Sequence, residues 1–210
     1  ICSSYLALFN NTTGTQNVAV GSNSLDSNTS GANNVSIGHT AMESNTTGQR
    51  NVAIGSHALD AGNGSFNVAV GHNSLTASTA SSNTAVGYVA LLANTTGIKN
   101  VAVGDLALDA NTTGSSNTGI GSEALTSNTT GTQVTAIGRL ALFSNTTGGS
   151  NTALGSQALL DNTTGALNTA VGAESLANNI SGGTNVSVGY QAMLANTTGG
   201  NNTALGTKSL

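Results

Sequence analysis

The sequence has no proline or tryptophan, a single cysteine, three tyrosines, three phenylalanines, and only four basic and eight acidic residues among 210. Four basic residues cannot form the patch that neutralises phosphates, which excludes nucleic-acid binding and electrostatic attachment to an anionic membrane. One cysteine, Cys2, excludes an internal disulfide framework and a multi-cysteine metal site. An ordinary globular domain is about one-quarter charged, so this chain stays soluble through Asn, Thr and Ser.

Long hydrophobic runs are also missing. The longest span four or five residues, as at 89–93, whereas a membrane-spanning helix needs about 20 and a signal-peptide core at least about seven. We therefore predict no membrane insertion in this segment. The 37% of hydrophobic residues are regularly spaced, which argues against disorder.

Glycine is abundant, with 28 residues, and twelve of these glycines mark an internal repeat. The pentapeptide Asn-Val-Ala-Val-Gly at 17–21 recurs every 17 residues, except for two intervals of 16 that separate Gly55, Gly71 and Gly87. The repeat predicts one continuous array over residues 1–210. The predicted structural turn glycines are Gly21, Gly38, Gly55, Gly71, Gly87, Gly104, Gly121, Gly138, Gly155, Gly172, Gly189 and Gly206.

Comparison of the repeats separates inside from outside. The residue before each Gly is aliphatic, as at Val20, and the fourth residue after it is Leu or Met, as at Leu25. We predict that these two columns form the core. Two columns admit only small residues, as at Ala19 and Ser24, and are expected to be surfaces through which chains associate. A fifth column, at Val18, alternates between Val and Thr. Charged and aromatic residues fall outside all five columns, which predicts an interior too narrow for a ring.

The regularly spaced helix-breaking residues exclude helices. Every unit contains a Gly and a segment of the Asn-Thr-Thr-Gly type, so no stretch between them is long enough for a helix to propagate. Alternation and β-branched residues instead predict strands of three to five residues joined by tight turns. We expect a positive φ at the repeat glycine and a left-handed Gly in the Asn-Thr-Thr-Gly turn. The predicted fold is all-β: a parallel β-solenoid (β-roll) of about twelve 17-residue coils, about 55–60 Å long.

Neither end of the sequence has the polar cap that protects a solenoid edge. The last residue, Leu210, falls midway through a unit, and Ser3 and Ser4 stand in the aliphatic and glycine columns. We expect these residues to be a segment of a longer fibre.

Asn-Val-Ala-Val-Gly, with a small residue three and Leu four positions after the Gly, resembles the head repeats of trimeric autotransporter adhesins of the Yersinia adhesin A type. It is also similar to repeats in tail fibres of phages and algal viruses. The resemblance covers essentially the whole chain. It implies a left-handed β-roll, three chains about a threefold axis, and an extracellular location on a cell or virion surface. The period is longer than in the adhesin heads by the Asn-Thr-Thr-Gly stretch, and no binding residue carries over.

The Asn-Thr-Thr segments match the acceptor pattern for N-glycosylation. The alternative is a turn with a ladder of Asn side chains, which we favour because a coil spacing of about 4.8 Å would crowd neighbouring glycans. The candidate glycosylation sites are Asn45, Asn94, Asn111, Asn128, Asn145, Asn162 and Asn196.

Aromatic residues and histidines provide the other candidates. Tyr88 and Tyr190 share the position after the Gly and are candidate surface-binding residues that could stack on sugars, although covering neighbouring backbone is the favoured role. His39 and His72 share that column two coils apart, about 9–10 Å, and His57 is one position further along, so we predict that one ion cannot be shared and that the histidines are solvated. The alternative is a metal or anion site at the axis of a trimer, formed by three copies of one His, one from each chain, if this column faced inward.

Catalysis is not expected. Residues Gly119-Ile120-Gly121 mimic a dinucleotide fingerprint, but the strand–turn–helix context is missing. Ser, His and Asp are not clustered, so we predict neither enzymatic activity nor a cofactor.

The predicted function is a structural or adhesive extracellular fibre, either a tail-fibre shaft or a surface adhesin head. Its predicted partners are copies of itself, as a homo-oligomer with a trimer favoured or as a filament, and a host-surface or glycan receptor. Two alternatives remain. One is an ice- or glycan-binding β-solenoid, suggested by the Thr residues of the Val18 column, although two outward Thr per coil would be needed and adjacent strand residues point to opposite faces. The other is a subunit of a self-assembled extracellular filament.

Overall fold

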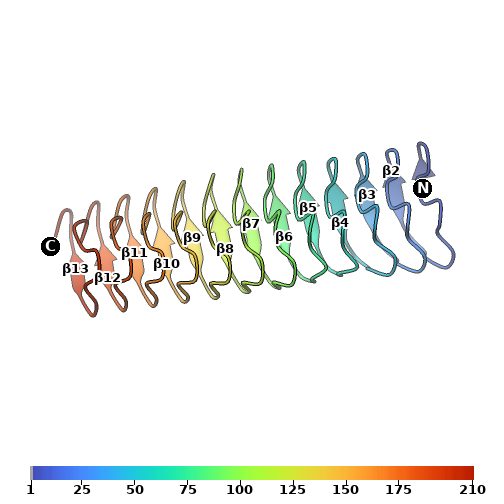
Figure 1. Cartoon of the computed structure of the whole chain (residues 1–210). Helices are drawn as coiled ribbons and strands as arrows, with labels where there is room; N and C mark the ends of the chain where they lie inside the picture. The colour runs from blue at the N-terminus through green and yellow to red at the C-terminus, as the bar shows by residue number, and fades with distance from the viewer. Residues whose placement is uncertain (1) are drawn as a thin grey trace.

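The computed structural model describes residues 2–210, which form a rod of stacked coils (Figure 1). Each coil contributes one short strand to a single parallel sheet, whose strand order follows the chain from β1 to β13. No helix occurs in this part of the chain. The strands are β1 (Cys2–Ser3), β2 (Val18–Val20), β3 (Val35–Ile37), β4 (Val52–Ile54), β5 (Val68–Val70), β6 (Thr84–Val86), β7 (Val101–Val103), β8 (Thr118–Ile120), β9 (Thr135–Ile137), β10 (Thr152–Leu154), β11 (Thr169–Val171), β12 (Val186–Val188) and β13 (Thr203–Leu205).

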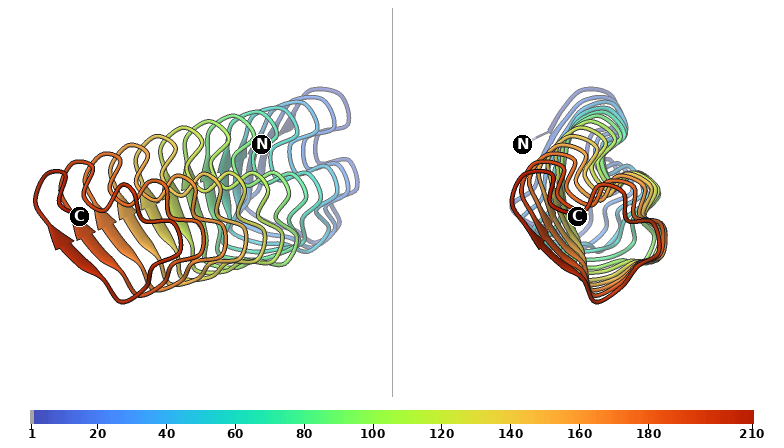
Figure 2. Two further views of the ribbon diagram at one scale, coloured as in Figure 1. Left: turned by 60° about the vertical axis from the view of Figure 1, so that its left-hand side comes forward. Right: turned by 90° about the vertical axis from the view of Figure 1, so that its left-hand side faces the viewer.

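Equivalent residues of successive coils lie directly beside one another. Ala19 of β2 pairs with Ser36 of β3, and the two 16-residue coils keep the same register, since Ala53 pairs with Ala69 and Ala69 with Ala85. Viewed along the rod, the coils lie one behind another with a gradual drift (Figure 2). The predicted parallel β-solenoid is confirmed.

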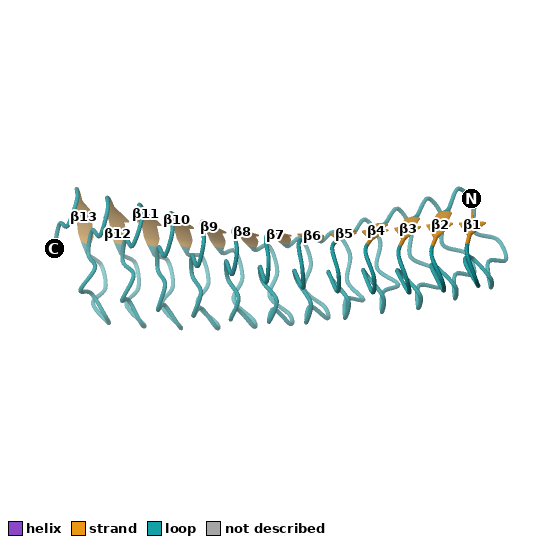
Figure 3. Ribbon diagram, turned by 90° about the horizontal axis from the view of Figure 1, so that it is seen from above, coloured by secondary structure: helices purple, strands orange, loops and turns teal. Residues whose placement is uncertain are grey.

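The interior lies between the sheet on one side and the turns on the other (Figure 3). Ala19 from the strand and Ser24 and Leu25 from the turn are fully buried, as are their equivalents in most coils. The Leu/Met column is therefore in the core, as predicted. The aromatic residues lie outside the core; Tyr5, for example, is 73% exposed. One buried Leu per coil fills most of the space between the sheet and the turns, which leaves no room for a ring.

The aliphatic column before the glycine is not in the core, contrary to prediction. Val20 is 37% exposed and Ile137 40% exposed, whereas the middle residue of every strand from β2 to β13 is buried. Successive strand side chains point to opposite faces, so a three-residue strand with its middle residue inward places both ends outward. The inward position holds a small residue because Leu already occupies the space opposite: a Cβ on Gly119 would lie 3.2 Å from Leu108 Cδ1. The small-residue columns are thus interior, and the prediction that chains associate through them is wrong.

The repeat glycines adopt the expected positive φ, between +115° and +143°. Space is equally restrictive, because a Cβ on Gly138 would lie 2.5 Å from the carbonyl oxygen of Gly155 in the next coil. Both constraints explain why no other residue occupies this column in the twelve repeats.

The second turn differs from the prediction. The Gly of Asn-Thr-Thr-Gly is not left-handed; the left-handed residue lies two positions later, as at Arg50 (φ +56°). Gly48 is needed for space instead, since a Cβ there would lie 2.5 Å from the Gly64 carbonyl oxygen. The core Leu residues are also left-handed, with φ +55° at Leu25, a conformation that L-residues with bulky side chains rarely adopt.

We expect Gly138→Val to destabilise the fold by about 3 kcal/mol or more, because it combines an unfavourable φ with a backbone clash. Arg139→Ala, at the exposed next position, is the control and should have little effect. Chemical unfolding followed by circular dichroism compares the two. Equal tolerance at both positions would contradict the stacking described above.

Candidate functional site

The outer side of the sheet is an uncharged surface that runs the length of the rod. We define the sheet face as the first and third residues of β2–β13. The first residues are Val or Thr and are half-buried in most strands, and the third are Val, Ile or Leu and are more exposed. The third residues are Val20, Ile37, Ile54, Val70, Val86, Val103, Ile120, Ile137, Leu154, Val171, Val188 and Leu205.

Threonines occupy the first position of β8 to β11 without interruption, at Thr118, Thr135, Thr152 and Thr169. Their side chains lie on the sheet face, since the buried residue of each strand is the next one. The other outward position is always aliphatic, as at Ile137. Each coil therefore presents two outward β-branched or aliphatic side chains, of which at most one is Thr.

The Asn residues of the Asn-Thr-Thr segments form a buried ladder. Asn128 Nδ2 donates to Asn111 Oδ1 of the preceding coil at 2.9 Å and to the Gly131 carbonyl oxygen at 3.2 Å. A glycan would have to replace a proton of this buried, bonded amide. The hydrogen bonds therefore favour the ladder over glycosylation of the folded coil. Among the candidates, Asn45, Asn94, Asn111, Asn128, Asn145 and Asn162 are fully buried, and Asn196 is half-buried.

A second Asn ladder precedes the strands, and its role was not inferred from the sequence although Asn recurs there. Asn117 Oδ1 accepts from the main-chain N–H of residue 134, and its Nδ2 donates to the Gly131 carbonyl oxygen at 2.8 Å. Val134 interrupts the ladder. Its own N–H still donates to Asn117, but its side chain can neither accept from the Asn151 N–H nor donate to the Gly148 carbonyl oxygen.

Four rings in successive coils form a row, which we call the ring row: His39, His57, His72 and Tyr88. Neighbouring ring centroids are 5.7, 6.2 and 5.7 Å apart. The sequence placed His57 one position out of the column of His39 and His72 and predicted that no ion is shared; in the structure the His57 ring lies between the other two rings. Tyr88 stacks on His72, while Tyr190 lies six coils further along and is 45% exposed.

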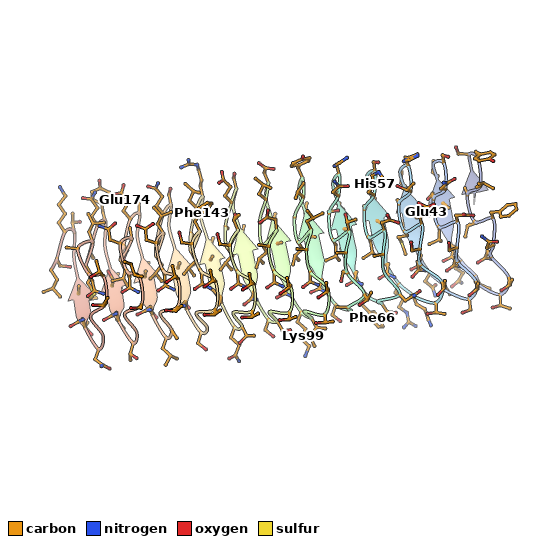
Figure 4. The ribbon with its side chains drawn as sticks, in the orientation of Figure 1. Glu43, His57, Phe66, Lys99, Phe143 and Glu174 are labelled. Atoms are coloured by element: carbon orange, nitrogen blue, oxygen red, sulfur yellow. The ribbon has the colours of Figure 1, made fainter. Side chains whose placement is uncertain are left out.

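The charged side chains lie outside the core. His57 and Glu43 lie toward one edge of the rod, and Phe66 and Lys99 toward the opposite edge (Figure 4). His57 Nδ1 is 4.0 Å from Asp60 Oδ2. Burial and the Glu43 carboxylate raise the pKa of Asp60. Burial likewise raises the pKa of Asp109, whose Oδ1 has no hydrogen-bond partner within residues 2–210.

The structural context of a nucleotide fingerprint is missing at Gly119, because β8 leads into a tight turn and not into a helix. Across the described residues, no three His, Cys, Asp or Glu side chains converge as a metal site. Two hollows, of about 340 and 290 Å³, lie at the last coils beside Leu210, and Lys208 is the one titratable residue that lines them.

We expect Val134→Asn to raise the free energy of unfolding by about 1 kcal/mol, because it restores an acceptor for the Asn151 N–H and a donor to Gly148. Val134→Asp is the matched control. It has the same shape but no amide donor and would bury a charge, so it should destabilise the fold. Thermal unfolding ranks the three proteins, and a Val134→Asn protein less stable than the parent would contradict the role of this ladder.

The raised pKa of Asp109 predicts a pH-dependent stability. The folded state holds the proton more tightly than the unfolded state, so ionisation costs stability at neutral pH, and the cost disappears as the pH falls through the raised pKa. Because the group is half exposed, we expect Asp109→Asn to stabilise by only about 0.5 kcal/mol at pH 7, with the gain lost at pH 3. Asp105→Asn, at an exposed carboxylate, is the control. A gain that persists unchanged at pH 3 would contradict the assigned cause.

Within residues 2–210 there is no helix long and apolar enough to cross a bilayer. Compared with known protein families, curated proteins and solved structures, the chain matches none. The resemblance to adhesin heads and tail fibres therefore stays a prediction.

Proposed function

We propose that this chain is a non-catalytic structural rod of an extracellular fibre and that it associates with copies of itself through the sheet face. The observation that carries the proposal is the continuity of this face: twelve strands present uncharged, β-branched or aliphatic side chains with no charged residue among them. The extracellular setting rests on the resemblance to adhesin and tail-fibre repeats.

Stiffness is the mechanical property that the coils support. Each coil is joined to the next by backbone bonds such as Gly38 N–H to the Val20 carbonyl oxygen at 2.8 Å. The two Asn ladders add side-chain bonds, as between Asn145 and Asn128, and the Leu column adds continuous apolar contact. Bending the rod sharply would strain all of these at once, which suits a shaft.

The size of the sheet face supports association. Twelve strands about 4.8 Å apart and three residues wide cover about 55 by 10 Å, or about 550 Å² before side-chain relief is counted. The largest apolar patch on a soluble monomer is typically about 300–600 Å² and is often functional, and the sheet face, with Thr at half of its first positions, is of this size. A stable interface buries about 800 Å² per partner. The sheet face could supply this area once the surface of its protruding side chains and of the flanking turns is added to the flat footprint.

A second copy of the chain is the occupant that fits the face best. Its side-chain rows have the same spacing, so ridges and grooves can match over the full length, whereas an unrelated partner would need the same period. Each chain has one such face, so association closes after two or three chains. We favour the trimer, because it agrees with the resemblance.

Receptor binding is assigned to the variable columns at the edges of the rod. Tyr88 and Tyr190 are exposed there, but the six coils between them correspond to about 29 Å. One sugar therefore cannot contact both, and each would serve a separate site on a glycan-bearing surface.

Sedimentation equilibrium tests the self-association. We expect the purified chain to have two or three times the mass of one chain and Ile120→Lys to shift it toward the monomer, because the charge would be buried unpaired. Thr130→Lys, in the exposed Asn-Thr-Thr-Gly turn away from the sheet, is the control and should leave the mass unchanged. A monomeric parent protein would refute the proposal. A mass that grows without limit and ignores Ile120→Lys would favour the end-to-end filament.

Ice binding is the second candidate, and one observation favours it: Thr118, Thr135, Thr152 and Thr169 form an unbroken outward row beside the aliphatic row. A regular row of hydroxyl and methyl groups is a surface on which ordered water could be held, but each coil supplies at most one of the two outward Thr that ice binding needs. A thermal-hysteresis measurement separates the candidates. Thermal hysteresis that a monomeric protein shows and that Thr135→Lys abolishes would favour the ice binder. The absence of thermal hysteresis would favour the rod.

A further inference from the structure

The imidazoles of the ring row are a set of metal-ligating groups to which the rod function gives no role. His39, His57 and His72 are the only histidines of the chain, yet they occupy three successive coils. Neither His39 nor His72 has a hydrogen bond to its ring within residues 2–210, and both are exposed. Their ring nitrogens are therefore free to bind a ligand from solution.

The tautomer of His57 follows from its hydrogen bonds. The Thr40 hydroxyl donates its one proton to the His39 carbonyl oxygen at 2.8 Å. The same Thr40 Oγ1 lies 2.8 Å from His57 Nδ1. Both contacts are hydrogen bonds only if Thr40 Oγ1 accepts from His57, and this assignment places the proton on Nδ1. The Asp60 carboxylate, 4.0 Å from Nδ1, favours the same tautomer. The neutral ring consequently keeps its lone pair on Nε2.

This arrangement is the one that metal-binding histidines use. A ligating His commonly donates its other ring N–H to an oxygen atom, which holds the ring and its tautomer in place. Here Thr40 supplies that oxygen from the preceding coil. His57 is thus oriented by its neighbours with Nε2 free.

The distances allow His57 to share an ion with either neighbour. A metal–nitrogen bond of about 2.1 Å places the ion about 3.2 Å from the ring centroid, so two rings on one ion have centroids at most about 6.4 Å apart. The observed separations are 5.7 Å to His39 and 6.2 Å to His72. Exposed side chains can make the remaining rotation without moving the backbone.

The charge around the row is also suitable. Asp60 and Glu43 are close enough for the Glu43 charge to act on the Asp60 carboxyl, and Glu43 accepts a 3.4 Å hydrogen bond from Asn23 Nδ2. Two carboxylates beside the imidazoles attract a cation. No basic residue has a contact with His39, His57 or His72 in the described part of the chain.

We propose that His57 Nε2 and a ring nitrogen of His39 or His72 bind one divalent transition-metal ion of the class that imidazole prefers, Cu²⁺, Ni²⁺ or Zn²⁺. No third His, Cys, Asp or Glu among residues 2–210 completes the site. Water therefore fills the other coordination positions. Among these ions Cu²⁺ binds most tightly. The site is a surface clamp between adjacent coils, and it is independent of the sheet face and of self-association.

The repeat itself supplies variants that will fold. Asn23 and Asn73 occupy the column of His57 with nearly the same left-handed φ, +56° and +54° against +56°, so His57→Asn fits the coil. Ser22 and Ser56 occupy the column of His39 and His72, so His39→Ser and His72→Ser fit as well. Tyr88→Phe changes the end of the row without removing a nitrogen and is the matched control.

Isothermal titration of the full chain with copper(II) or nickel(II) chloride tests the proposal, with circular dichroism to verify that each variant is folded. We expect His57→Asn, which removes both pairs, to weaken binding by about tenfold or more. The double variant His39→Ser/His72→Ser, which leaves His57 alone, should weaken it as much. Either single Ser variant keeps one pair and should bind within about threefold of the parent, as should Tyr88→Phe.

Electron paramagnetic resonance of the copper-loaded protein counts the coordinated nitrogens. We expect two in the parent chain and one in His57→Asn at high copper concentration. The proposal is overturned if the parent shows no binding below about 1 mM, or if His57→Asn or the double Ser variant binds as tightly as the parent.

Discussion

The direct stacking of each residue on its counterpart one coil away is the constraint on which the rest of the structure depends. At about 4.8 Å between coils, any atom added where the backbone itself is in contact meets the next coil. A Cβ on Gly155 would lie 2.5 Å from the Gly172 carbonyl oxygen. One substitution therefore disturbs two neighbouring coils, which explains why Gly occupies this column in all twelve repeats from Gly21 to Gly206.

Stacking also decides where polar groups can be buried. A buried amide normally costs free energy unless its donors and acceptors are paired. In this rod an Asn finds its partner in the Asn of the next coil, so a column of Asn is self-satisfying where a single Asn would not be. Asn45 illustrates the end of such a run: Gly62 stands where the next coil would hold an Asn, and Asn45 Oδ1 is left without a partner among the described residues. Charges cannot be stacked in this way because like charges repel, and they lie at the periphery.

The surface follows from the same arrangement. Only one side chain of each three-residue strand fits inside, so two point outward, and the rod carries an uncharged face of Val, Thr, Ile and Leu side chains. The edges of the coil are free of this constraint and vary from repeat to repeat. That freedom allowed three histidines to gather in consecutive coils, with Thr40 orienting His57.

The sequence by itself determined the period, the register and the fold class, because these depend on the recurrence of Gly, Leu and Asn and on the absence of long apolar or helical stretches. It also placed Leu25 and its equivalents inside. Only the tertiary structure decided which face of each strand is inward. Val20 and Ala19 are both apolar, and the choice depends on the Leu that enters from the opposite side of the coil and leaves room for Ala alone. The left-handed conformation of that Leu, the ladder role of the Asn before each strand, and the meeting of His57 with His39 and His72 likewise depend on contacts between coils, which residue preferences along one coil do not encode.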